Sequence, residues 1–196
     1  ATRASENMTV SQYHCDRAGF ELTMHPFCRT AVGSVDWGGV IMNRHLARDN
    51  KRGNTRRTSD LFEIATGITN QCSVQCIAIQ PNGLQDLPAF ELDFLRTLPT
   101  TWDETRLLAG HPGQYVALAR RHGDQWYVAC LNGTDKEMTL TIDASMFGGK
   151  ELRLYNDTKQ RSENRPVSAL TTAKADKKGQ LKVTLQPMGG AIICEK

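Results

Sequence analysis

The sequence predicts an α+β protein in which a helical part of an α/β layer precedes a small antiparallel β-sandwich. As far as Pro99, apolar residues recur mainly at the three- and four-residue steps that are typical of helices. From Glu104 onward they alternate with polar residues, and turn residues interrupt this alternation at short intervals. We therefore divide the chain into two domains, residues 1–102 and residues 103–196.

The N-terminal part contains one expected strand. Thr30–Val35 lies between Pro26 and the pair Gly38-Gly39, and we expect it to be buried. Helices follow this segment, and a strand with helices behind it is the unit of a parallel α/β sheet. A single unit of this kind cannot bury both of its faces. We therefore expect the N-terminal part to belong to a larger α/β layer.

The clearest helix is expected over residues 59–79. Asp60 with Glu63 three residues later resembles a capping box, and Thr58 and Ser59 are alternative caps. Apolar residues at helical spacing would form one buried stripe, which consists of Leu61, Ile64, Ala65, Ile68 and Cys72.

The second half of that segment, residues 73–79, is also consistent with a separate turn or short helix, and the turn sequence Pro81-Asn82-Gly83 ends it. A second helix is expected from Pro88 to Leu98, because proline suits the first position of a helix. Pro99 then ends this helix. Its buried face would consist of Phe90, Phe94, Leu95 and Leu98.

Seven short strands are expected in the C-terminal part, and their number and spacing favour a sandwich or a small barrel. Tyr115–Arg121 and Gln125–Leu131 form the most convincing hairpin, because His122-Gly123-Asp124 supplies a turn between them. The polar segment Asp157–Arg165 is expected to be an exposed loop. The seven strands are residues 106–108, 114–121, 125–131, 138–142, 151–155, 181–185 and 191–194.

Composition and spacing exclude several functions. No apolar run approaches the ~20 residues of a membrane span. The net charge of +3 is too small to indicate nucleic acid, and the basic stretch 44–57 is expected to be a solvated loop rather than a phosphate-binding patch. The six cysteines and five histidines lack the spacing of zinc ligands, and no glycine-rich phosphate loop is present. We therefore expect no zinc, no nucleotide site, no nucleic-acid partner and no membrane span.

Two acidic residues before the sandwich are candidates for catalysis. Glu6 and Asp36 both lie where loops are expected to leave strands. In a (β/α) barrel such strand ends line the active face, and hydrolysis of a glycoside needs two carboxyl groups there. The residues alone leave the alternative open that both side chains are solvated or ion-paired.

Several motifs resemble glycoside hydrolase family 97. Pro99-Thr100-Thr101-Trp102-Asp103-Glu104-Thr105-Arg106 resembles the family's junction between barrel and C-terminal domain, and so do the residues from Gly113-Gln114-Tyr115-Val116 to Trp126-Tyr127-Val128. Pro26-Phe27-Cys28-Arg29 and Gly33-Ser34-Val35-Asp36 resemble the family's Pro-Phe-Thr-Arg and Gly-Pro-Met-Asp segments. The departures lie at Ala4-Ser5 and at Trp37-Gly38-Gly39-Val40, and from them we expect a substrate preference that differs from that of the best-known members.

The resemblance implies a fold and an activity. Residues 1–102 would be the C-terminal remnant of a (β/α)8 catalytic barrel, and residues 103–196 the β-sandwich that follows it. The intact protein would be an α-glycosidase that hydrolyses α-glucosidic or α-galactosidic bonds in oligosaccharides or other α-glycosides. Arg3-Ala4-Ser5-Glu6 matches the family's Arg-Gly-x-Glu, so Glu6 would be the general acid and would lie at a catalytic calcium ion. Asp36 would line the sugar pocket or fix the last barrel loop.

Two further expectations follow from the resemblance. The protein would be periplasmic or secreted in a bacterium. The 196-residue chain alone would be inactive, since the other catalytic carboxylate and most calcium ligands would lie upstream of it. The alternative is a non-catalytic sandwich that braces the barrel or binds carbohydrate through Trp102, Trp126 or Tyr155.

Overall fold

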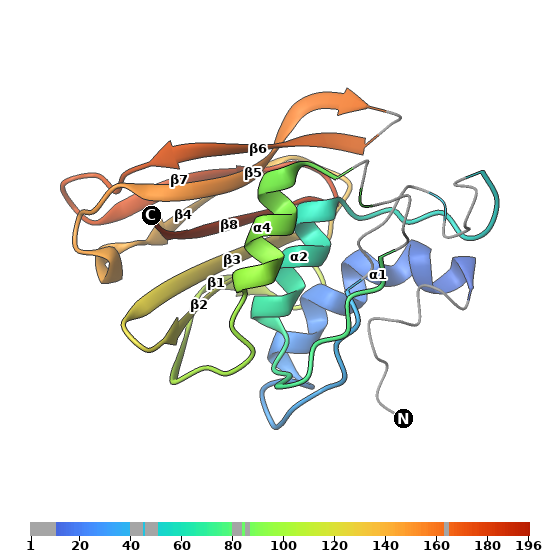
Figure 1. Cartoon of the computed structure of the whole chain (residues 1–196), viewed down its shortest axis with the longest axis horizontal. Helices are drawn as coiled ribbons and strands as arrows, with labels where there is room; N and C mark the ends of the chain where they lie inside the picture. Colours follow the sequence, from blue (N-terminus) through green and yellow to red (C-terminus); the bar gives the residue numbers. More distant parts are fainter. Residues whose placement is uncertain (1–10, 40–44, 46–50, 80–83, 85–86, 163–164) are drawn as a thin grey trace.

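The computed structural model describes residues 11–39, 45, 51–79, 84, 87–162 and 165–196. Three α-helices precede eight β-strands in these residues, and Figure 1 shows helices α2 and α4 lying over one face of a large sheet. The helices are α1 (Gln12–Met24), α2 (Asp60–Thr69) and α4 (Ala89–Thr97). The strands are β1 (Glu104–His111), β2 (Tyr115–His122), β3 (Gln125–Asn132), β4 (Met138–Asp143), β5 (Leu152–Ser162), β6 (Arg165–Ala173), β7 (Gln180–Leu185) and β8 (Gly190–Glu195).

The strands form two antiparallel sheets. Six of them lie in the order β1-β2-β3-β8-β5-β6, and β4 pairs with β7 in a second, two-stranded sheet. β2 and β3 are joined by the predicted hairpin turn, with His122 opposite Gln125 in the register. The antiparallel C-terminal architecture predicted from the two-residue periodicity is therefore confirmed.

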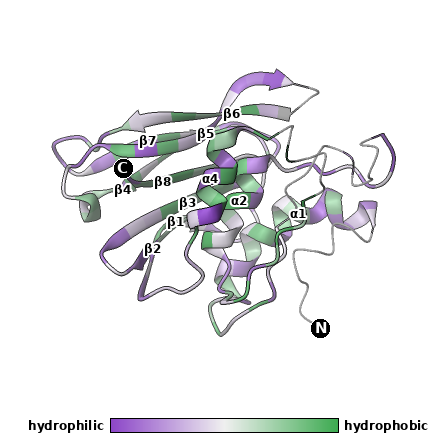
Figure 2. Cartoon of the chain, in the orientation of Figure 1, coloured by the Kyte–Doolittle hydropathy of each residue, from purple (hydrophilic) through white to green (hydrophobic). Residues whose placement is uncertain are grey.

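The large sheet has a core on each face, because side chains along a strand alternate between the faces. On β3, Trp126, Val128 and Cys130 pack against the β4–β7 sheet. Tyr127, Ala129 and Leu131 point the other way and pack against the helices. Figure 2 shows β8, in the middle of the large sheet, as hydrophobic over much of its length. The sheet is therefore the middle layer between a small sheet and a helical layer.

Helix α2 is shorter than predicted. Its N-terminus is capped by Ser59, whose Oγ accepts a hydrogen bond of 2.9 Å from the backbone N–H of Phe62. The helix ends at Thr69 because the residues that follow it pair with residues 35–37, which precede the helix in the sequence. The backbone N–H of Val35 donates to Gln71 O at 2.9 Å, and Trp37 forms an isolated parallel bridge with Gln75. Residues 73–79 are thus separate from α2, as the alternative had it, but they form bends and bridges rather than a short helix.

The strand expected at Thr30–Val35 is not formed. Residues 28–32 are a turn in which the backbone N–H groups of Arg29 and Thr30 both donate to His25 O. Val32 is 82% exposed, so the segment Thr30–Val35 is not a buried strand. The segment contains too few apolar residues to distinguish the periodicity of a strand from that of a helix. Helix α1, which was not predicted as an individual element, buries only a sparse stripe that consists of Cys15, Ala18, Gly19, Leu22 and Thr23.

The segment Asp157–Arg165 is not the exposed loop that we expected. β5 continues through it to Ser162, and β6 returns from Arg165 as an edge strand of the large sheet. The segment was misjudged because an edge hairpin can be polar on the face that no layer covers. Asp157, at its start, is buried on the helix side of the sheet.

The helices and the sheet share one hydrophobic core. Leu61 and Phe62 of α2 and Phe94 of α4 lie in the same cluster as Leu131 and Ile192 of the sheet. α4 ends at Thr97 and β1 begins at Glu104, on either side of the predicted domain boundary. No helix in the described part of the chain is long and apolar enough to cross a membrane.

Candidate functional site

Of the two predicted site residues, the catalytic Glu6 and the sugar-binding Asp36, the structure describes Asp36. Asp36 is exposed and lies between the buried residues Val35 and Trp37. The side chain of Trp37 is anchored to α2, because its Nε1–H donates a hydrogen bond to Thr66 Oγ1 at 2.6 Å. The backbone at Asp36 is therefore held while its side chain faces solvent. Glu6 lies outside the described residues.

The expected calcium ion needs a cluster of oxygen ligands, usually several carboxylates. Within the described ranges, no group of three or more histidine, cysteine, aspartate or glutamate side chains is placed to hold a metal ion. Asp36 alone does not form such a site. The ligands expected from the family resemblance are Glu6 and residues upstream of the chain, which lie outside the described residues, and we derive no chemical step through a calcium ion.

The N-terminus of α2 is fixed to the sheet by a buried carboxylate. Ser59 Oγ donates to Asp157 Oδ2 at 2.5 Å, and the backbone N–H of Gly190 donates to the same oxygen at 2.8 Å. Burial raises the pKa of Asp157 to about 7, although both hydrogen bonds act to lower it. One side chain of β5 thus connects the helix cap with the first residue of β8.

Charged groups surround this connection between helix and sheet. Arg56, which we expected in a solvated basic loop, is 3% exposed and forms an ion pair with Asp60. Thr58 Oγ1 donates to Glu63 Oε1 at 2.5 Å. Burial, followed by the negative charge of Asp60, raises the pKa of Glu91 on α4 to about 8. These groups are enclosed between layers, so we assign them a structural role rather than a catalytic one.

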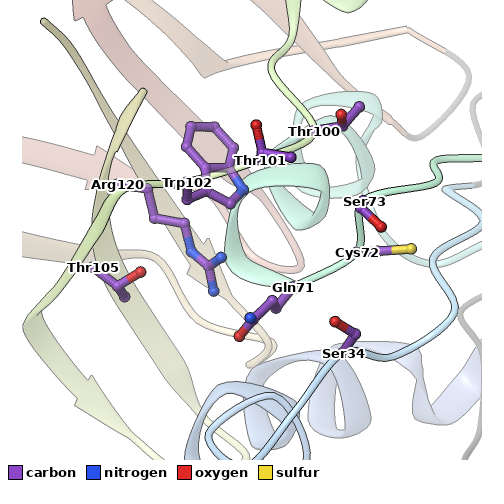
Figure 3. Close-up of a pocket in the computed structure, with 9 residues that line it drawn as sticks. All are labelled: Ser34, Gln71, Cys72, Ser73, Thr100, Thr101, Trp102, Thr105 and Arg120. Carbon is purple, nitrogen blue, oxygen red and sulfur yellow. The ribbon is translucent and has the colours of Figure 1, made fainter. Parts of the chain in front are cut away.

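The described residues form a polar pocket of about 230 Å³ where the helical part meets the sandwich. It is lined by Ser34, residues 71–73, residues 100–102, Thr105 and Arg120. Figure 3 shows the guanidinium group of Arg120 extending toward Gln71, with Trp102 and Thr105 on its two sides. The rim is mostly exposed hydroxyl and amide side chains, whereas Arg120 is 4% exposed. The pocket thus has a buried cation at its base.

Arg120 is held by partners that do not neutralise it. Its Nη2 donates to Thr69 O at the C-terminal end of α2, at a long 3.4 Å, and its guanidinium lies 5.9 Å from the Trp102 ring centroid. Burial lowers the pKa of Arg120 to about 10. Among the described residues, neither Arg120 Nε nor Trp102 Nε1 has a hydrogen-bond partner.

Sequence reasoning did not identify Arg120, Asp157 or Glu91 as buried charges. A signal for Arg120 existed, since Arg120 and Arg121 are adjacent in a strand and must point to opposite faces. Arg121 faces outward and forms ion pairs with Glu104 and Asp103. No comparable signal existed for Glu91, whose burial depends on how α4 packs on the sheet.

Residues 101–195 match the protein family described as glycosyl-hydrolase 97 C-terminal, oligomerisation. The match begins within the linker after α4 and covers nearly all of the sandwich. Together with the fold, it defines this chain as a C-terminal region of a glycoside hydrolase. Residues 101–195 therefore belong to the C-terminal region of glycoside hydrolase family 97, as the motifs had indicated.

Individual relatives cover the helices as well as the sandwich. A retaining α-galactosidase from Bacteroides thetaiotaomicron is 33% identical over 94% of this chain. The crystal structure of a β-arabinopyranosidase is 44% identical, with a TM-score of 0.90 over 98% of this chain. A family 97 enzyme from Pseudoalteromonas sp. strain K8, solved with panose, is 22% identical over 91% of this chain, with a TM-score of 0.74, and supports the fold alone.

The chain spans a minor part of each relative. It covers 28% of the Bacteroides α-galactosidase, 30% of the β-arabinopyranosidase and 28% of the Pseudoalteromonas enzyme. What these proteins do as a whole therefore concerns this chain only by inference.

Proposed function

We propose that this chain is the C-terminal supporting region of a retaining glycosidase that acts on pyranosides of the galactose configuration. The similarity to the β-arabinopyranosidase, 44% identical over 98% of the chain, carries this proposal. The α-galactosidase from Bacteroides thetaiotaomicron supports it. β-L-Arabinopyranose has the ring configuration of α-D-galactopyranose and lacks only the exocyclic hydroxymethyl group. One substrate class therefore accounts for both relatives.

The role of this region is to brace the catalytic domain. The helices and the sandwich share a core, and Ser59, Asp157 and Gly190 link them through buried hydrogen bonds. A carbohydrate-binding role for the sandwich is less well supported, because Trp126 and Tyr155 are buried in its two cores. The aromatic residues that we considered for stacking on sugar rings do not form an exposed platform.

Catalysis would come from residues before the described part. We propose Glu6 as the general acid, which in a retaining enzyme also acts as the base in the second step. Asp36 would contribute to sugar binding from the exposed segment before Trp37. A calcium ion at Glu6 and a periplasmic or secreted location in a bacterium remain proposals from the family resemblance, as does the (β/α)8 barrel to which residues 1–102 would belong.

The substrate class is tested by comparing aryl glycosides with the intact protein. We expect kcat/KM for p-nitrophenyl α-D-galactopyranoside or β-L-arabinopyranoside to exceed that for α-D-glucopyranoside by roughly two orders of magnitude or more. A site built to hydrogen-bond the axial hydroxyl strongly rejects a sugar that lacks it. The β-D-galactopyranoside serves as the control for the anomeric configuration. A preference for the α-glucoside would contradict the proposal.

A further inference from the structure

The pocket between the helical part and the sandwich has features of a built site for a negatively charged group. Among the described residues that line it, Arg120 is the only charged one and none is acidic. The side chain is 4% exposed and is directed into the space bounded by Gln71 and Thr105. A buried charge without a counter-charge destabilises the folded protein unless another group compensates it.

The nearby carboxylates are engaged elsewhere. Asp103 Oδ2 accepts a hydrogen bond of 2.7 Å from the backbone N–H of Gly123, and Glu104 forms ion pairs with Arg106 and Arg121. Among the described residues, the only polar partner of the Arg120 guanidinium is Thr69 O, at the end of α2. A helix C-terminus favours a cation but carries only about half a charge. Most of the charge on Arg120 is therefore uncompensated by the described residues.

The other lining groups suit an oxygen-rich anion. Ser73, Thr100, Thr101 and Thr105 carry hydroxyl groups, and Gln71 carries an amide, all of which can donate hydrogen bonds. The planar guanidinium group matches the geometry of a carboxylate or phosphate better than that of a spherical ion. The volume of about 230 Å³ lies below the roughly 300–1,000 Å³ of pockets for larger ligands. A small oxyanion therefore fits both the charge and the size.

We propose that this pocket binds an oxyanion, with Arg120 as the principal charged ligand. The oxyanion has two possible sources. It is either a free carboxylate or phosphate compound, or a carboxylate side chain from another part of a longer protein that reaches the junction. The proposal concerns the junction pocket and does not depend on which glycoside the intact protein hydrolyses.

The indole N–H groups offer a direct test on the 196-residue chain. The chain has three tryptophans, of which Trp102 lines the pocket, whereas Trp37 Nε1 donates to Thr66. We expect sodium acetate or sodium phosphate, added in a chloride-free buffer, to shift the Trp102 indole signal in a ¹H–¹⁵N spectrum in a saturable manner. The signals of Trp37 and Trp126 should shift little, and Trp102→Phe identifies the signal.

Arg120→Gln should weaken this binding at least tenfold, which corresponds to about 1.4 kcal/mol. Arg121→Gln is the matched control, because Arg121 is the neighbouring residue of the same strand and is ion-paired on the outer side. If Arg120→Gln does not fold, Thr105→Val tests the same pocket, because Thr105 lies opposite Arg120 on the neighbouring strand β1. It should also weaken anion binding. The proposal is overturned if the Trp102 signal of the wild-type chain responds to neither anion. It is also overturned if the Trp102 signal of Arg120→Gln responds to the anions as strongly as that of the wild type.

The intact protein distinguishes the two sources of the oxyanion. If a carboxylate of the same protein fills the pocket, added anions should leave its melting temperature unchanged and Arg120→Gln should lower it. If the ligand is free, acetate or phosphate should raise the melting temperature of the wild type and not that of Arg120→Gln. No response to anions together with no effect of Arg120→Gln in the intact protein would contradict both sources.

Discussion

Gly190→Ala should be among the most destabilising single substitutions in this chain. A Cβ atom at Gly190 would lie 2.6 Å from both the N and the Cα atoms of Phe62, and 2.7 Å from Leu61 O. All three are backbone atoms of α2, so no flexible side chain can move aside. The helix would have to shift away from β8, and the hydrogen bond from the Gly190 N–H to Asp157 would be disturbed. Overpacking of this kind costs about 1–3 kcal/mol or more.

Gly33→Ala is the matched control for this substitution. A Cβ atom at Gly33 would meet no atom within 4 Å, and its φ lies outside the left-handed range. We expect it to be neutral or to stabilise the fold by about 0.4–1 kcal/mol, because alanine restricts the unfolded chain. The measurement is urea unfolding of the two variants and the wild type. Equal unfolding free energies for Gly190→Ala and Gly33→Ala would show that α2 does not press against β8.

Glu91→Gln should change how the stability of the protein depends on pH. Glu91 is fully buried, and burial raises its pKa in the folded state from an ordinary value of 4.5 to about 8. The charged groups that act on it are Asp60, Asp157 and Arg56. Because the folded protein binds this proton more tightly than the unfolded chain, Glu91 contributes stability below pH 4.5 that is lost as pH rises through about 8.

The expected result is a difference between two pH profiles. Between pH 4.5 and about 8, the unfolding free energy of the wild type should fall relative to that of Glu91→Gln. The slope should not exceed about 1.4 kcal/mol per pH unit for one proton. Glu151→Gln is the control, because Lys196 lowers the pKa of that exposed carboxyl. Parallel profiles for the wild type and Glu91→Gln would mean that Glu91 is ionised in the folded protein.

The sequence predicted the sandwich well because its information is local. Alternation along β3 placed Trp126 and Tyr127 on opposite faces, and the turn at Gly123 set the register of the first hairpin. Ser59 was among the alternative caps for α2, since serine before an apolar helical stripe is a local signal. In each case the deciding residues lie within a few positions of one another.

The buried polar groups could not be predicted because they depend on contacts between distant residues. Asp157 accepts hydrogen bonds from Ser59, 98 residues away in sequence, and from Gly190, 33 residues away. The polar composition after Asp157 favoured a loop, although the segment completes an edge hairpin. The candidate catalytic residue Glu6 stays a prediction from the family resemblance. Asp36 is exposed, as expected of a loop residue, but the strand that we expected before it is not formed.

The central claim is that this chain supports catalysis in a family 97 enzyme and does not perform it alone. A single carboxyl group without its partner lacks most of the stabilisation of the transition state. The most direct test is the release of p-nitrophenol from the α-D-galactopyranoside and the β-L-arabinopyranoside, by the purified 196-residue chain and by the intact protein at equal molar concentration. We predict turnover by the intact protein and none by the chain. Turnover by the chain would contradict this account and would place a complete active site within its 196 residues.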